Sequence, residues 1–124
     1  MAYKPRILIA DDEPAVLKVM MKRLEQFGFE VLGASDGEEA LNLIRRERPD
    51  LIVLDVMMPK KNGYEVCSIL KRDETLRMIP VIMFTAKEEK TDQVTGAMMG
   101  ADAYVPKNCG AKVLLEHIRM LLTV

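Results

Sequence analysis

The chain has 124 residues, of which 49% are hydrophobic and 30% are charged, with a formal net charge of −1 at pH 7. This composition excludes an intrinsically disordered chain, and the nearly balanced charge provides no basic field for nonspecific nucleic-acid binding. No apolar run is long enough to cross a bilayer and the N-terminus lacks the features of a signal peptide, so we expect one cytoplasmic domain over residues 1–124.

Five short, mainly apolar segments recur along the chain and predict strands at residues 7–10, 29–32, 51–54, 81–84 and 103–105. The first, third and fourth are apolar throughout, as expected of parallel strands that are buried on both faces. The second segment contains Glu30, which favours a position at the edge of the sheet.

Helical periodicity separates these segments. A first helix follows Pro14, a residue suited to the first turn, and a second follows Asp36, which can cap it while Glu39 completes a capping box. The third, fourth and fifth helices are indicated by apolar residues at helical spacing, and Gly100 can end the weaker fourth. These residues are Val66, Ile69 and Leu70; Val94, Ala97 and Met98; and Leu114, Ile118 and Leu121.

Alternating strands and helices predict a doubly wound α/β fold of five βα units, with a parallel sheet and helices on both faces. The sequence alone does not fix the strand order. The common order for five such units is 2-1-3-4-5, as in flavodoxin-like folds, and ligands then bind beyond the carboxyl ends of the strands. This order makes the first and third strands neighbours, about 4.8 Å apart.

Polar residues follow four of the five predicted strands. The first strand ends at Asp11 and Asp12, followed by a third acid, and the third strand ends at Asp55. Thr85 follows the fourth strand, and Lys107 follows the fifth. Carboxylates together with a hydroxyl and an ammonium can bind Mg²⁺ and a phosphoryl group and supply a carboxylate nucleophile.

These residues resemble the response-regulator receiver family over essentially the whole chain. The resemblance rests on four segments in order, namely Asp11-Asp12, residues 55–63 (DVMMPKKNG), Thr85-Ala86 and residues 100–107 (GADAYVPK). It implies a phosphoacceptor switch of a two-component system, which assists its own phosphorylation and dephosphorylation but is not an enzyme. Members of this family are among the proteins that define the 2-1-3-4-5 order.

The resemblance also implies a role for each site residue. Asp55 would accept the phosphoryl group. Asp12, Asp55 and the backbone carbonyl of Met57 would bind Mg²⁺, with Asp11 contributing through a water molecule. Lys107 would pair with Asp55 and then with the phosphoryl oxygens.

Two further residues would connect the site to an output surface. Thr85 would bind the phosphoryl group, and Tyr104 would reorient with it. The output surface would be the fourth helix, fifth strand and fifth helix. The implied partners are a sensor histidine kinase and a downstream protein or attached effector domain, with no direct contact to nucleic acid or membrane. The domain would be a monomer or a weak phosphorylation-dependent dimer.

One residue departs from the family pattern. Receivers commonly have proline directly after the site lysine, joined by a cis bond, whereas here Asn108 follows Lys107 and Pro106 precedes it. A cis bond before Asn108 would cost about 3–4 kcal/mol. The sequence leaves the isomer of this bond open.

Three other functions agree less well with this sequence. A flavin-binding electron carrier needs a phosphate-binding loop after the first strand, where this chain has three acids. A Mg²⁺-dependent phosphatase with an aspartate nucleophile needs a substrate cover, for which 124 residues leave no room. A degenerate receiver that binds its partner constitutively is disfavoured by the intact acids, Thr85 and Lys107.

Overall fold

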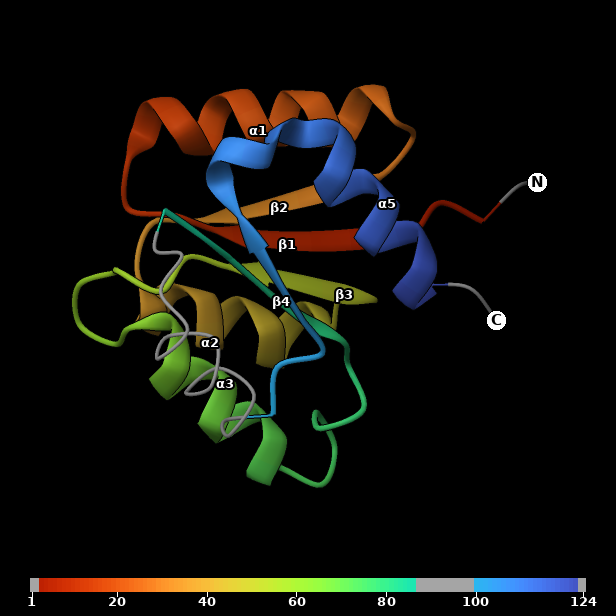
Figure 1. Cartoon of the computed structure of the whole chain (residues 1–124). Coiled ribbons are helices and arrows are strands. Elements are labelled where there is room, and N and C mark those ends of the chain that lie inside the picture. The colour runs from red at the N-terminus through yellow and green to blue at the C-terminus, as the bar shows by residue number, and fades with distance from the viewer. Residues whose placement is uncertain (1–2, 87–99, 123–124) are drawn as a thin grey trace.

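The computed structural model describes residues 3–86 and 100–122, and these form one sheet with helices on both faces (Figure 1). The sheet has five parallel strands in the order β2-β1-β3-β4-β5. Their bounds are β1 Arg6–Ala10, β2 Glu30–Ala34, β3 Leu51–Leu54, β4 Val81–Thr85 and β5 Ala103–Pro106. The predicted strand order and the edge position of the strand containing Glu30 are therefore confirmed.

Four α-helices are described, α1 Pro14–Gln26, α2 Gly37–Glu47, α3 Gly63–Arg72 and α5 Gly110–Leu122, with a short 3₁₀ helix at Lys107–Cys109. Figure 1 shows α1 and α5 on one face of the sheet and α2 and α3 on the other. The fourth helix that the sequence predicts, at residues 94–98, lies outside the described residues.

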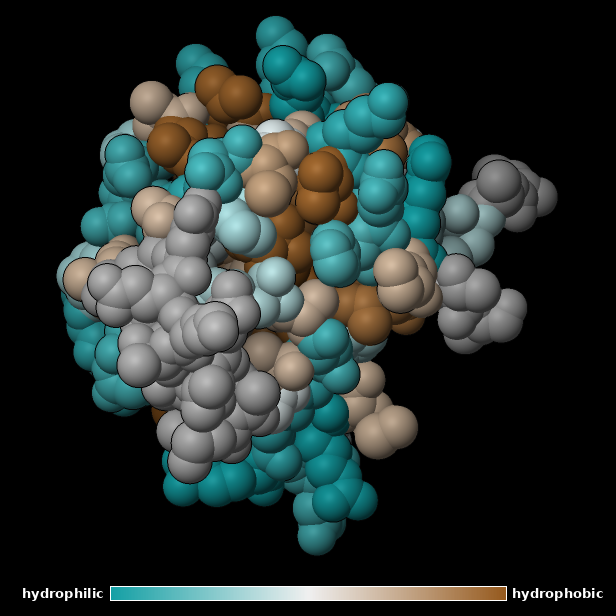
Figure 2. All heavy atoms as spheres, in the orientation of Figure 1, coloured by the Kyte–Doolittle hydropathy of each residue, from teal (hydrophilic) through white to brown (hydrophobic). Residues whose placement is uncertain are grey.

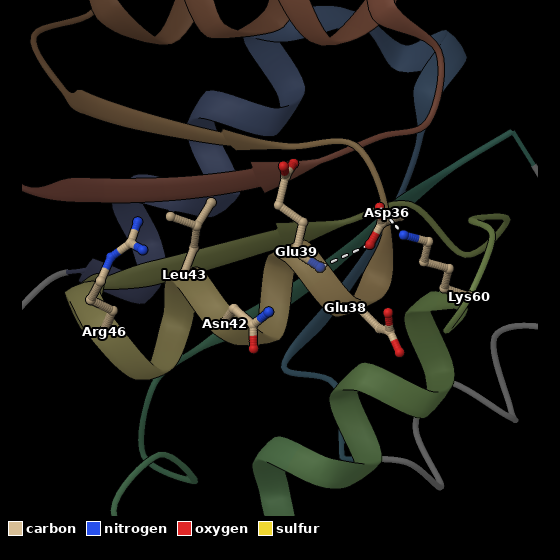
Figure 3. A pocket seen from close by; sticks show the side chains of 7 residues that line it. All are labelled: Asp36, Glu38, Glu39, Asn42, Leu43, Arg46 and Lys60. Atoms are coloured by element: carbon tan, nitrogen blue, oxygen red, sulfur yellow. Dashed lines mark hydrogen bonds and ion pairs between the residues drawn. The ribbon is translucent and has the colours of Figure 1, made fainter.

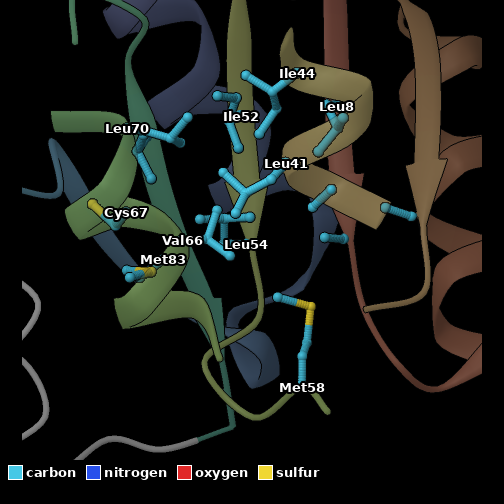
Figure 4. Packing of buried hydrophobic residues seen from close by; sticks show 14 of the residues in the cluster. Leu8, Leu41, Ile44, Ile52, Leu54, Met58, Val66, Cys67, Leu70 and Met83 are labelled. Atoms are coloured by element: carbon cyan, nitrogen blue, oxygen red, sulfur yellow. The ribbon is translucent and has the colours of Figure 1, made fainter. Parts of the chain in front are cut away.

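Side chains that alternate along each strand enter two separate cores. Leu8, Ile52, Leu54 and Met83 pack against α2 and α3, as Figure 4 shows. Their strand neighbours pack against α1 and α5, and these include Ile7, Ile9, Val53 and Phe84. Both faces of the central strands are thus covered, which is the physical reason that their sequences are apolar throughout.

The second strand differs from its prediction at both ends. It begins at Glu30 and continues to Ala34, because each residue from Arg6 to Ala10 pairs with one residue of β2. The capping of α2 also differs in part. Asp36 accepts a hydrogen bond from the Glu39 amide at 2.8 Å, as predicted, but the Glu39 carboxylate accepts from the Ser35 amide and completes no capping box.

Lys71, near the end of α3, connects three segments at the edge of one core. Its ammonium donates hydrogen bonds to the carbonyl oxygens of Arg77 and Ile79, both at 3.0 Å, and to Asp102 at 3.1 Å. The Asp102 carboxylate also accepts from the Val81 amide at 2.8 Å. The start of β4 and the turn before β5 are therefore tied to α3 by one side chain.

We expect Lys71→Met to lower the free energy of unfolding by about 2 kcal/mol, because the charged donor is lost and its acceptors lose a partner. Urea unfolding followed by circular dichroism measures this difference. Lys112→Met is the matched control, since Lys112 is exposed on α5. Equal stability of the two variants would contradict the connecting role of Lys71.

Several large apolar side chains are exposed on the surface of the described residues. Among the exposed large ones are Val19 of α1 and Met120 of α5, and Figure 2 shows apolar residues over these helices among hydrophilic ones. Scattered apolar residues of this kind are normal on a domain surface. No helix in the described ranges has the length and apolar character needed to span a membrane.

Candidate functional site

Three aspartates meet at the carboxyl ends of β1 and β3. The two strands are neighbours in the sheet, and the Asp55 amide donates to the Ala10 carbonyl at 3.0 Å. Carboxylate oxygens of Asp11, Asp12 and Asp55 all lie within 4.8 Å of one another. Asp11 and Asp55 are buried, with 2% and 5% of their surfaces exposed, whereas Asp12 is exposed.

Lys107 provides the positive charge at this cluster. Its Nζ lies 2.6 Å from Asp11 Oδ2 and 3.2 Å from Asp55 Oδ2, so one ammonium bridges two buried carboxylates. The sequence prediction named Asp55 as its partner and missed Asp11, which is the nearer of the two. The sequence does contain an indication of the pair between Lys107 and Asp11. Two acids at the ends of adjacent strands need a compensating positive charge, and Lys107 follows another strand of the same sheet.

Burial is the largest influence on the pKa of Asp55. It raises the pKa above its ordinary value of 3.8, and the Asp11 charge acts in the same direction, while the Lys107 charge opposes both. Burial by itself lowers the pKa of Lys107, but the hydrogen bond to Asp11 and the charge of Asp55 outweigh it, and the pKa lies above its ordinary 10.5. The site therefore holds an ammonium beside a carboxylate whose ionisation costs free energy.

This raised pKa predicts a pH-dependent effect of Asp55→Asn on stability. Above the folded-state pKa the ionised Asp55 destabilises the folded state, whereas below its ordinary value of 3.8 the carboxyl is protonated in both states and the penalty disappears. Lys107 keeps its shorter ion pair with Asp11 in the variant. We expect the metal-free variant to melt at a higher temperature than the wild type near pH 7.

Thermal melts in the presence of a chelator at about pH 7 and about pH 3 measure this effect. The advantage of the variant should be absent at the lower pH. A variant that melts below the wild type near pH 7 would show that the lost contact between Lys107 and Asp55 outweighs the relief of burial and repulsion.

The loop from β3 to α3 is packed closely against Asp55. The Met57 amide donates to Asp55 Oδ1 at 3.3 Å, and the Gly63 amide donates to the Val56 carbonyl at 2.9 Å. A Cβ atom on Gly63 would lie only 2.4 Å from the Asp55 carbonyl oxygen. Gly63 is not among the described residues with positive φ, so glycine is needed here for space and not for a left-handed backbone conformation.

Thr85 and Tyr104 lie on the two strands beyond β3. Thr85 ends β4 and is buried, with 1% of its surface exposed. Tyr104 is half-buried on β5, and its hydroxyl lies 3.5 Å from that of Tyr64 on α3. The Lys107–Asn108 bond is trans, since the described ranges contain no cis peptide bond. Lys107 therefore reaches both carboxylates without the cis bond that is common in receivers.

This geometry agrees with the comparisons with known proteins. The family model described as "Response regulator receiver domain" matches residues 7–119 of the chain. The chain belongs to the response regulator receiver family. It is thus a receiver domain of the kind found in two-component response regulators. This family membership argues against the two alternative functions, a flavin-binding electron carrier and a Mg²⁺-dependent phosphatase.

Relatives of this receiver domain include transcriptional regulators. The chain is 45% identical over 119 residues to the "Probable transcriptional regulator ycf27" of Guillardia theta, covering 96% of this chain and 46% of that protein. It is 43% identical over 117 residues to the alkaline phosphatase synthesis transcriptional regulatory protein PhoP of Bacillus subtilis, covering 94% and 48%. The receiver domain thus spans about half the length of these curated relatives.

A solved structure confirms the fold. The signal receiver domain of a signal transduction histidine kinase from Syntrophus aciditrophicus has a TM-score of 0.88 and 37% identity to this chain. The match covers 95% of this chain and 89% of that one. The receiver fold of the chain therefore agrees with that of a relative along nearly its whole length.

The acidic cluster of this receiver domain suits Mg²⁺, which receiver domains typically bind at an acidic pocket. Its donors are all carboxylate oxygens, and Mg²⁺ prefers oxygen ligands, usually with several waters retained. The exposure of Asp12 leaves one side of the cluster open to water, while the buried Asp11 and Asp55 form the other side. The residues present therefore fit the ion that the family implies.

Proposed function

We propose that Asp55 is the phosphoacceptor of this receiver domain and that Asp11, Asp12, Asp55 and the Met57 carbonyl form its Mg²⁺ site. The observation that carries this proposal is the position of the Asp55 carboxylate, which is buried beside Asp11 and in contact with the Lys107 ammonium. A carboxylate nucleophile needs an oxygen with an available lone pair, and each Asp55 oxygen accepts one hydrogen bond among the contacts described, Oδ1 from the Met57 amide and Oδ2 from the Lys107 ammonium.

In the proposed reaction, an Asp55 carboxylate oxygen forms a bond to phosphorus while the bond from phosphorus to the kinase histidine breaks. Lys107 would then hold an oxygen of the transferred group, and its charge would compensate the charge added to the site. Bound Mg²⁺ would supply further positive charge to the phosphoryl oxygens. The domain would assist its own phosphorylation in this way. The same charges would assist dephosphorylation, in which a water oxygen forms a bond to phosphorus while the bond from phosphorus to the Asp55 oxygen breaks.

The switch that we propose connects the site to an output surface through Thr85 and Tyr104. Phosphorylation adds charge and acceptor oxygens at Asp55, and the Thr85 hydroxyl would move toward them. The Tyr104 ring would change position in response, and these two positions would provide the two-state element. The output surface would comprise the predicted fourth helix, β5 and α5. A change from a rare to a dominant active state needs roughly 5 kcal/mol of differential stabilisation.

The proposed partners of this domain, which we place in the cytoplasm, are a sensor histidine kinase and a downstream protein or an attached effector domain. Two relatives are named transcriptional regulators, which supports an output in transcription. We propose that residues 1–124 act as one receiver domain and leave DNA contacts to the effector, because their net charge is −1. The domain would be a monomer or a weak dimer that forms on phosphorylation.

Acetyl phosphate, with and without Mg²⁺, tests this function. We expect one phosphoryl group per chain with Mg²⁺ and none in the presence of a chelator. Borohydride reduction of the acyl phosphate followed by mass spectrometry should place the modification at Asp55. Modification of another residue, or equal modification without Mg²⁺, would contradict the proposal.

A further inference from the structure

The N-terminus of α2 contacts the loop between β3 and α3. The Gly37 amide donates to the Pro59 carbonyl at 3.4 Å, and the Lys61 amide donates to the same carbonyl at 2.8 Å. A Cβ atom on Gly37 would lie 2.0 Å from the Lys61 carbonyl oxygen and 2.7 Å from the carbonyl carbon. Only a residue without a side chain allows the two backbones to approach this closely.

A charged contact lies beside this backbone contact. Figure 3 shows Lys60 pointing from the loop toward Asp36, and its Nζ lies 3.7 Å from Asp36 Oδ2. Asp36 also caps α2 through the Glu39 amide. Lys60 has a φ of 67°, so the loop turns sharply at this residue. An exposed ion pair adds little stability, and the backbone packing at Gly37 is therefore the stronger constraint.

The same loop is held on its other side by α3. Gly63 lies against the Asp55 carbonyl, where a Cβ atom would be 2.4 Å from the oxygen. Asn62 and Glu65 form a capping box that fixes the first turn of α3. The loop that carries Met57 is therefore enclosed between the first residues of two helices, Gly37 of α2 and Gly63 of α3.

From this enclosure we infer that Gly37 and Gly63 are positioning residues for the Mg²⁺ site. The inference rests on the proposed function, in which the Met57 carbonyl is a metal ligand. A real Cβ atom does not approach within 3.0 Å of such an atom, so a methyl group on Gly37 must displace the Lys61 carbonyl by about 1 Å, from 2.0 to 3.0 Å. The displaced backbone is only four residues from Met57.

Mg²⁺ is sensitive to a displacement of this size. It requires near-octahedral geometry with ligand distances of about 2.0–2.1 Å, and it adapts poorly to a misplaced ligand. Changes to groups that orient metal ligands typically lower metal affinity about 10- to 100-fold. Alanine is a better helix former than glycine, so Gly37→Ala should not weaken α2 itself.

The test compares Gly37→Ala with the wild type and with Gly33→Ala. Gly33 on β2 is a matched control, because its added Cβ would lie 2.4 Å from Met21 Sδ, the flexible part of a side chain on α1. Calorimetric titration with Mg²⁺ should show about 10- to 100-fold weaker binding for Gly37→Ala and about wild-type binding for Gly33→Ala. Hydrogen exchange of the metal-free proteins should be faster at the Lys61 amide in Gly37→Ala alone.

Wild-type Mg²⁺ affinity and wild-type exchange at Lys61 in a folded Gly37→Ala variant would overturn this inference and leave the proposed function intact. Absence of Mg²⁺ binding by the wild type would overturn both. If Gly37→Ala does not fold, Gly63→Ala tests the same enclosure from α3, and unchanged Mg²⁺ affinity in that variant would likewise overturn the inference.

Discussion

Asp55→Asn is expected to abolish phosphoryl incorporation from acetyl phosphate. The amide of asparagine is a very weak nucleophile, so the variant lacks the proposed acceptor group. The variant keeps the shape of the side chain, so the fold should be unchanged. Mass spectrometry of the intact protein after incubation with acetyl phosphate and Mg²⁺ measures the loss.

Asp50→Asn provides the matched control for this experiment. Asp50 directly precedes β3 and thus lies at the opposite end of this strand from Asp55, and its carboxylate accepts hydrogen bonds from the Tyr3 hydroxyl and the Arg6 amide. This variant should be phosphorylated like the wild type. If Asp55→Asn still incorporated one phosphoryl group, the assignment of the acceptor would be wrong.

Lys107→Ala is expected to destabilise the metal-free domain and to strengthen its binding of Mg²⁺. Removing the ammonium leaves Asp11 and Asp55 buried and uncompensated, and breaking a buried ion pair in this way costs about 3–5 kcal/mol. Two uncompensated carboxylates attract a divalent cation more strongly, and we expect Mg²⁺ affinity to rise about tenfold or more.

Urea unfolding with and without Mg²⁺ measures both effects for Lys107→Ala. Saturating Mg²⁺ should restore part of the lost stability, because the ion binds the folded state only. Lys112→Ala removes an exposed lysine of α5 and should change neither quantity. Weaker Mg²⁺ binding by Lys107→Ala would mean that the lysine organises the site more than it competes with the cation.

The strands could be predicted because the sheet is buried on both faces, whereas their order came from the common arrangement of five βα units and from the family resemblance. The core strands of such a sheet must be apolar throughout, and β3 was predicted with its observed bounds, Leu51–Leu54. The ends of β2 were less predictable, since they depend on pairing with Arg6–Ala10 and not on local sequence. The meeting of Asp11 and Asp55 followed directly from the strand order.

Contacts within the site depend on the path of the loops in space, which the order of residues along the chain does not reveal. The bridge from Lys107 to Asp11 requires the path of the loop after β5, and the sequence was informative only about charge. The need for Gly37 and Gly63 arises from backbone approaches of 2.0 and 2.4 Å measured from an added Cβ. A glycine in a sequence indicates conformational freedom or close packing, and only the structure distinguishes the two.

The two cysteines differ enough to give a chemical tool. Cys67 is a buried residue of α3, and burial raises the pKa of its thiol to about 11, whereas Cys109 is exposed two residues after Lys107. A thiol reagent near neutral pH therefore reacts at Cys109 and leaves Cys67 unmodified. A single fluorophore attached there, without any engineered cysteine, would report in real time on the loop that carries the site lysine.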